Sequence, residues 1–336
     1  MVSRPHRLAA IDIGTVTTRM LVADVSGVRV CPLLERTHIT HLGEGVSRTG
    51  HLSGEALGRV SHVIDGYVDD LRDVSTDVSL GPRPVERVVA MATSAARDAD
   101  NAAELEDMLE QADIELLVID GQREARLSFL GAASGFPRER MLLADIGGGS
   151  TELVFGDASL DEGSQQLDVG VCAARSFDLG CRRLTEQFLT SDPPAAAEME
   201  RLRRQVRGQV GSFVEELPCR PRLLVVVGGT ATTLVAVDQH MERYDASRVN
   251  GAVTSREMLE AVTERLASRT EDERRRVAGL QPQRAGVIVA GALILEEVVS
   301  ACGLDSFVTS ESDILEGVLL DAAARLDQRA NRFTRN

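Results

Sequence analysis

The chain contains no lysine, so its 37 basic side chains are all arginine. Without lysine it can form neither the phosphate loop of Walker type nor a Schiff base. It also lacks tryptophan, and aromatic residues make up only 3% of it, which argues against a platform that binds nucleic acid by base stacking. The formal net charge of -15 argues against general binding to DNA or to an anionic membrane surface.

The five cysteines are odd in number and include no Cys-x-x-Cys pair, which favours reduced thiols. The opening Met1-Val-Ser-Arg4 lacks the pattern of a signal peptide, and no apolar run reaches membrane-spanning length. We therefore expect a cytoplasmic protein that binds neither nucleic acid nor membrane. With 336 residues, the chain is long enough for two domains with real cores.

The most informative stretch is residues 142–155. Here an apolar run ends at Asp145, three glycines and two hydroxyl residues follow, and a second apolar run begins after Glu152. The pattern predicts two strands joined by a tight turn. Because glycine lacks a side chain, several N–H groups can face one concavity that binds phosphate. Asp145 and Glu152 at its edge are suited to hold a divalent cation. We predict a phosphate loop beside a Mg²⁺ site.

The same pattern occurs near the start of the chain, in residues 7–25. Asp12 there corresponds to Asp145, and Gly14 corresponds to Gly147. Asp-x-Gly turns also recur by chance, but two copies favour two related half-domains that face each other across a cleft. The ligand site would then lie where the two turns meet.

Three further features are candidates for phosphate chemistry. Gly228, Gly229 and Thr230 follow an apolar run, so their N–H groups could hold more phosphate; close packing of helix on strand is the alternative. Arg97, near a helix start, could bind two oxygens of an anion with its guanidinium group. Glu124 is a candidate base, and for both charged residues the alternative is a solvated position on a helix.

Several stretches together resemble the exopolyphosphatase/guanosine pentaphosphate phosphohydrolase (Ppx/GppA) family, within the actin-like fold. They span nearly the whole chain in the family's order, and the length resembles the short, two-domain actinobacterial members. The matching stretches are Asp12-Ile-Gly-Thr15, Ala92-Thr-Ser-Ala-Ala-Arg97, Gly121-Gln-Arg-Glu-Ala-Arg126, Asp145-Ile-Gly-Gly-Gly-Ser-Thr-Glu152, Gly228-Gly-Thr-Ala-Thr-Thr233, Ala290-Gly-Ala-Leu-Ile-Leu295 and Ser310-Glu-Ser-Asp-Ile-Leu-Glu-Gly317.

The resemblance implies an α/β fold of two actin-like (ribonuclease H-like) half-domains, with mixed sheets flanked by helices and an active-site cleft between them. We expect one domain to comprise residues 1–123 plus about 304–336, and the other residues 124–303. The implied activity is hydrolysis of the terminal phosphate of inorganic polyphosphate with Mg²⁺ (or Mn²⁺). Guanosine pentaphosphate is the alternative substrate, and the resemblance also implies a link to the stringent response and a homodimer.

The resemblance also implies residue roles. Glu124 would orient or deprotonate the attacking water, and Asp145, Glu152 and Asp12 would hold the metal. The residues implied in phosphate binding are Gly14, Thr15, Thr17, Arg97, Gly147, Gly148, Gly149, Ser150, Gly228, Gly229 and Thr230. The chain departs from the family pattern at Val16, where Asn is usual, at Arg123, where an acid is usual, and at Gly286, where Asp is usual.

Three readings from other classes stay open on the sequence alone. The first is a nucleotide-binding switch or filament subunit similar to actin, in which hydrolysis would be incidental. The second is a kinase of the same fold, which would transfer phosphate to an alcohol instead of to water. The third is a regulator that binds polyphosphate or guanosine nucleotides without cleaving them.

Overall fold

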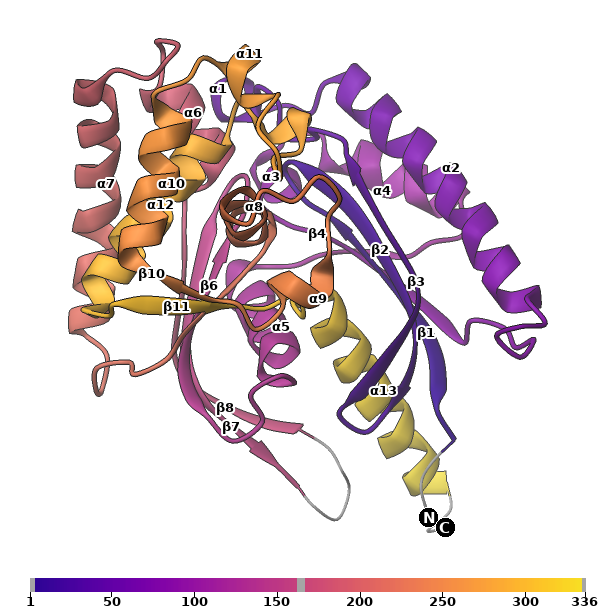
Figure 1. Ribbon diagram of the computed structural model, residues 1–336. Coiled ribbons are helices and arrows are strands. Elements are labelled where there is room, and N and C mark those ends of the chain that lie inside the picture. Colours follow the sequence, from indigo (N-terminus) through magenta and orange to yellow (C-terminus); the bar gives the residue numbers. More distant parts are fainter. Residues whose placement is uncertain (1–3, 162–166, 334–336) are drawn as a thin grey trace. The chain divides into compact units, whose positions relative to one another are not determined.

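The structure is a computed structural model that describes residues 4–161 and 167–333. The chain divides into two compact units (Figure 1). The first unit comprises residues 1–138, 158–169 and 312–336, and the second comprises residues 139–157 and 170–311. Each unit is described by itself.

This division differs from the expected boundary at residue 123, because helix α5 stays with the first unit. Helix α5 (Gly121–Ala133) packs against α13 (Ile314–Phe333) through two glycines. A Cβ atom on Gly131 would lie 1.7 Å from the Asp313 carbonyl oxygen, and one on Gly317 would lie 1.8 Å from the Leu127 oxygen. Such close approach of two helix backbones requires glycine and ties α5 to α13.

The first unit contains a five-stranded mixed sheet in the order β3-β2-β1-β4-β5. Strands β1, β2 and β3 pair antiparallel, whereas β4 and β5 are parallel to β1. Besides α5 and α13, its elements are β1 (His6–Ile13), β2 (Thr17–Ser26), β3 (Arg29–Ile39), α1 (Val46–Thr49), α2 (Gly54–Thr76), β4 (Arg87–Ala92), α3 (Ser94–Asp98), α4 (Ala102–Gln111) and β5 (Leu116–Val118).

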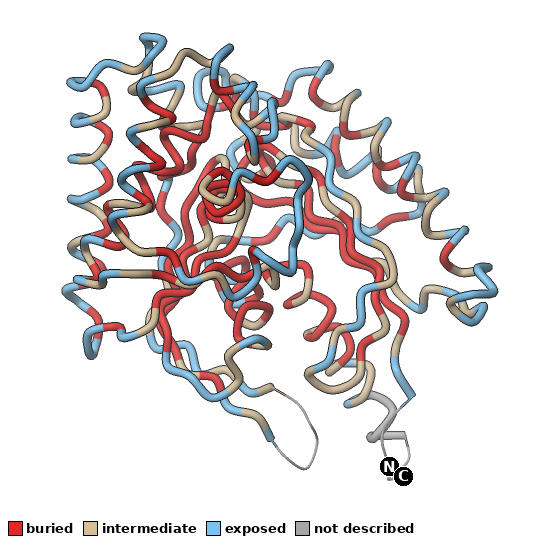
Figure 2. Tube along the Cα trace, viewed as in Figure 1, coloured by how far each residue is buried: buried red, intermediate tan, exposed pale blue. Residues whose placement is uncertain are grey.

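Both faces of this sheet are covered by helices, which explains why β1 is buried along almost its whole length. Ala9 and Ile11 pack into a core shared with α2 and α4, whereas Leu8 and Ala10 pack into a core shared with α5 and α13. Figure 1 shows α2 and α4 on one side of the sheet and α13 on the other. Figure 2 shows the central strands buried and the outer helices exposed along one side.

The second unit is built on a six-stranded sheet in the order β10-β11-β9-β6-β7-β8. Helices α6, α7, α8, α10 and α12 contribute with the strands to one large apolar core. The elements are β6 (Arg140–Ile146), β7 (Thr151–Leu160), β8 (Leu167–Phe177), α6 (Cys181–Phe188), α7 (Ala196–Glu215), β9 (Leu224–Val227), α8 (Gly229–Asp238), α9 (Ala246–Val249), β10 (Val253–Ser255), α10 (Arg256–Ala267), α11 (Glu271–Arg274), η1 (Pro282–Arg284), α12 (Ile288–Cys302) and β11 (Ser306–Thr309).

The two sheets repeat one topology, with β10 as an addition. Reading β8-β7-β6-β9-β11 in the second unit gives the same succession as β3-β2-β1-β4-β5 in the first. In both, the first hairpin is antiparallel and the following strands are parallel to its first strand. The repeat expected from Asp12 and Asp145 is thus a repeat of whole sheets. No helix in the described part of the chain combines the length and apolar composition needed to cross a membrane.

Candidate active site

The first glycine turn joins β1 to β2 and is closed by its own backbone. The Gly14 N–H donates to the Thr17 carbonyl at 2.8 Å. The Thr15 carbonyl accepts from the Gly43 N–H at 2.9 Å, and the Val16 carbonyl accepts two N–H groups from the same loop. Since C=O and the next N–H point in opposite directions in a trans peptide, the N–H groups of Val16 and Thr17 point away from this loop.

Asp12, beside this turn, is paired with a guanidinium. Asp12 lies directly opposite Arg19 in the β1–β2 register, and Arg19 Nη2 donates to Asp12 Oδ2 at 2.8 Å. Arg19 also bonds Asp313 at the start of α13. Burial raises the pKa of Asp12, and Arg19 opposes that rise. The predicted metal ligand Asp12 therefore already has a positive partner.

Arg97 and Glu124, to which the sequence assigned separate roles, form an ion pair in the first unit. Arg97 Nη1 donates to Glu124 Oε2 at 2.6 Å and to the Ile119 carbonyl at 2.8 Å. Glu124 is buried, with 7% of its surface exposed, and lies in the first turn of α5, after N-cap Asp120. The pair fixes the direction in which the Glu124 carboxylate points.

The second glycine turn joins β6 to β7 and has the same closure, with the Gly147 N–H donating to the Ser150 carbonyl at 3.0 Å. The first turn of α6 holds its outer side. The Gly147 carbonyl accepts from the Cys181 N–H, and the Gly148 carbonyl accepts from the next two N–H groups of α6. A Cβ on Gly180 would lie 2.2 Å from the Gly148 oxygen. The N–H groups of Gly148 and Gly149 therefore point away from α6, as an anion-binding turn requires.

Asp145 and Glu152 flank this turn on one face of the sheet. They are direct cross-strand partners in the antiparallel β6–β7 pair, so their side chains are neighbours. Ser176 Oγ donates to Glu152 Oε1 at 2.6 Å. Two carboxylates side by side are the oxygen donors that Mg²⁺ takes. Within residues 4–161 and 167–333, no group of three or more His, Cys, Asp or Glu side chains is arranged to hold a metal.

The third glycine corner, between β9 and α8, approaches Asp145 closely. Gly228 has φ of +86°, and a Cβ on it would lie 3.0 Å from Asp145 Oδ1, so both backbone and space require glycine. The Thr230 hydroxyl lies 3.4 Å from the Ile146 carbonyl. A Cβ on Gly229 would lie 2.1 Å from Arg284 Nη1. Arg284 thus lies against the corner. The sequence around Arg284 did not predict this position.

Each unit gathers its candidate residues where its parallel strands end, which is where ligands bind in such sheets. The first unit brings together Asp12, Gly14, Thr15, Thr17, Arg97 and Glu124, after β1, β4 and β5. The second brings together Asp145, Gly147, Gly148, Gly149, Ser150, Glu152, Gly228, Gly229 and Thr230, around the ends of β6 and β9. Their roles stay predictions.

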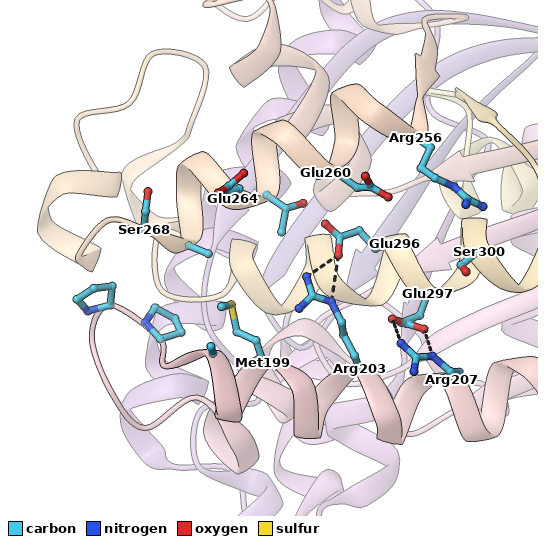
Figure 3. A pocket seen from close by; sticks show the side chains of 15 residues that line it. Met199, Arg203, Arg207, Arg256, Glu260, Glu264, Ser268, Glu296, Glu297 and Ser300 are labelled. Carbon is cyan, nitrogen blue, oxygen red and sulfur yellow. Dashed lines mark hydrogen bonds and ion pairs between the residues drawn. The ribbon is translucent and has the colours of Figure 1, made fainter.

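A separate cavity of about 660 Å³ lies in the second unit between α7, α10 and α12. Figure 3 shows Arg203 paired with Glu296 and Arg207 paired with Glu297 across it. None of the predicted site residues lines this cavity, so it is no part of the candidate active site.

Two mixed sheets of one topology, flanked by helices, define the actin-like class of α/β proteins. Within that class, the chain belongs to the Ppx/GppA phosphatase family, whose model matches residues 21–326. The fold and family predicted from the sequence are therefore confirmed.

Individual relatives match over nearly their full length. Exopolyphosphatase 2 of Mycobacterium tuberculosis is 37% identical, with 94% of this chain and 98% of that protein covered. The Aquifex aeolicus member of the Ppx/GppA family is 28% identical, with a TM-score of 0.77 and coverage of 96% and 98%. An exopolyphosphatase from Cytophaga hutchinsonii is 26% identical, with a TM-score of 0.81 and coverage of 94% and 98%.

Proposed function

We propose that the protein is an exopolyphosphatase that uses Mg²⁺ to hydrolyse the terminal phosphate of inorganic polyphosphate. The observation that carries the proposal is the Gly147–Ser150 turn, whose amides face away from α6 beside the Asp145–Glu152 pair. Such a turn suits the oxygens of a terminal phosphate. Relatives that bear the name exopolyphosphatase, from Mycobacterium tuberculosis and Cytophaga hutchinsonii, support the substrate class.

In this proposal the glycine turns hold the terminal phosphate through backbone N–H groups. Glu124 accepts a proton from the attacking water at its carboxylate, and Arg97 keeps that carboxylate oriented. Oxygen attacks phosphorus as the bond to the bridging oxygen breaks, and the shortened polyphosphate leaves. Charge spreads over the equatorial oxygens in this reaction, so the protein mainly supplies position and positive potential.

The carboxylates of Asp145 and Glu152 would hold the metal. Mg²⁺, when bound, would neutralise charge on the phosphate oxygens and on the two acids. The acids fit the ion chemically, because both offer hard oxygen donors on one face of the sheet. The Ser176 hydroxyl, bonded to Glu152, would orient one ligand. Mn²⁺ is the alternative ion.

Guanosine pentaphosphate is a second candidate substrate, favoured by Tyr244. The scarcity of aromatic residues argues for polyphosphate, but Tyr244 is a residue with 49% of its surface exposed, and its hydroxyl bonds Glu311. Glu311 follows β11, which is parallel to β9 and ends at the same sheet edge as the Gly228 corner. An exposed ring there offers a face on which a base could stack. A cytoplasmic location, a homodimer and a link to the stringent response stay predictions.

The central experiment measures phosphate release with Mg²⁺ from long polyphosphate, short polyphosphate and guanosine pentaphosphate in parallel. We expect Glu124→Gln to lower kcat by about 10²-fold or more, because a general base contributes about that much. Glu104→Gln, which changes an exposed glutamate on α4, is the matched control. Full turnover by Glu124→Gln would remove the base from the mechanism, and sedimenting polymer with slow nucleotide turnover would favour a filament subunit instead.

Metal binding is tested without turnover. Titration of wild-type protein with Mg²⁺ in a calorimeter should show a site that Asp145→Asn and Glu152→Gln each weaken at least about tenfold. Asp12→Asn should have a smaller effect, since Asp12 already pairs with Arg19. Equal losses in all three variants would instead place Asp12 among the ligands.

A further inference from the structure

Helix α6 holds the Gly147–Ser150 turn through one side chain in addition to its backbone. Arg183 Nε donates to the Gly149 carbonyl at 2.8 Å. The Gly147 and Gly148 carbonyls are held by N–H groups at the start of α6. Three successive carbonyls therefore point toward α6, and the third of them is held by a side chain.

The orientation of this third peptide matters for anion binding. Glycine rotates easily about both backbone bonds, so a peptide between Gly149 and Ser150 needs an outside contact to fix it. A trans peptide places its N–H opposite its C=O. As long as Arg183 holds the Gly149 oxygen, the Ser150 N–H points to the side of the turn that faces away from α6. There it joins the N–H groups of Gly148 and Gly149.

We propose that Arg183 is a positioning residue for phosphate binding, acting through the Gly149 carbonyl on the Ser150 N–H. The inference rests on the proposed role of the turn in holding phosphate. The Arg183 side chain is only 20% exposed, and its Nη2 lies 3.8 Å from Asp178 Oδ1. The contribution that we propose for Arg183 is the donor at Nε, which is separable from the charge of the guanidinium.

Three substitutions separate the donor from the charge. In Arg183→Gln, the amide nitrogen stands the same number of bonds from Cα as Nε does, so the donor is kept and the charge is lost. In Arg183→Lys, the charge is kept, but a methylene replaces the donor at that position. In Arg183→Met, a side chain of similar length keeps neither.

The test measures orthophosphate binding by calorimetry, together with kcat and KM for phosphate release from polyphosphate. We expect Arg183→Met and Arg183→Lys each to weaken orthophosphate binding about three- to tenfold, which is the range of one neutral hydrogen bond. The glutamine variant should stay within about twofold of wild type. KM should rise by the same factor while kcat changes little, because the turn holds phosphate before and during the reaction. Arg201→Gln, on the exposed side of α7, controls for loss of a surface charge.

The opposite ranking would overturn the inference. If Arg183→Lys binds orthophosphate as wild type does and Arg183→Gln does not, Arg183 acts by its charge. If all three variants match wild type, Arg183 has no role in phosphate binding. Unfolding midpoints are measured for each variant to check that it is folded. If Arg183→Met does not fold, the comparison of Arg183→Gln with Arg183→Lys still decides between the donor and the charge. If the wild-type protein binds orthophosphate but releases none from polyphosphate, the proposed function is refuted. The order of orthophosphate affinities among the Arg183 variants then tests the inference without the kinetic measurements.

Discussion

Glu316 makes the stability of the first unit depend on pH. It lies in the first turn of α13, where one carboxylate oxygen accepts the Asp313 N–H at 3.0 Å. Burial, followed by the nearby Asp313 carboxylate, raises the pKa of Glu316 from 4.5 to about 8. The folded protein therefore keeps a proton at neutral pH that the unfolded chain releases.

The sign and size of the effect follow from this difference. Because the folded pKa is the higher one, the stabilisation is complete below pH 4.5 and is lost as the pH rises to about 8. One pKa unit corresponds to about 1.36 kcal/mol, which gives an upper value of about 5 kcal/mol. Glu316 keeps some contact with solvent, so screening reduces the expected loss to roughly 2–4 kcal/mol.

Glu316→Gln tests this reasoning, because the amide oxygen can still accept the Asp313 N–H but cannot ionise. Urea unfolding at pH 5, 7 and 8.5 should show the variant gaining roughly 2–4 kcal/mol on wild type across this range. Burial also raises the pKa values of Asp12 and Glu35, and these rises act in the same direction in wild type and variant. Glu106→Gln, on the exposed side of α4, should leave the wild-type slope unchanged. An identical slope in wild type and Glu316→Gln would refute the reasoning.

Two further substitutions test the backbone around the site. Gly228→Ala should lower the free energy of unfolding by about 1–3 kcal/mol, because alanine is strained at φ +86° and its Cβ would contact Asp145. The substitution should also lower kcat/KM. Unchanged unfolding in urea would contradict this prediction. Arg7→Met should cost about 3–5 kcal/mol, because the buried Arg7 bonds Asp24 and carbonyls such as Leu80; a urea midpoint equal to wild type would show that these contacts contribute nothing.

The local parts of the fold were predictable because they depend on residues adjacent in sequence. Apolar runs bounded by Asp-x-Gly predicted the strands and turns around Gly14 and Gly147, and both turns close with the same hydrogen bond. The Ser53 side chain caps α2 by accepting the Ala56 N–H, a role that serine before a helix favours. Glycine after the apolar run at residues 223–227 predicted the corner at Gly228.

The parts that could not be predicted depend on residues far apart in the chain. Arg19 meets Asp313 across 294 positions, and no local pattern announces that pairing. For the same reason no local pattern indicated that α5 belongs with α13, since the contact of Gly131 with α13 exists only in the folded unit. No residue next to Arg183 in the sequence indicates that its Nε holds the Gly149 carbonyl, 34 positions away.

The two glycine turns are alike in backbone and differ in charge, which bears on where a metal would bind. Asp12 faces Arg19 in the first sheet, whereas the equivalent Asp145 faces Glu152 in the second. The first pair neutralises itself, but like charges placed directly opposite destabilise a sheet. A divalent cation beside Asp145 and Glu152 would remove that repulsion. We therefore propose different tasks for the two turns, with phosphate held by both and Mg²⁺ held beside Asp145 and Glu152.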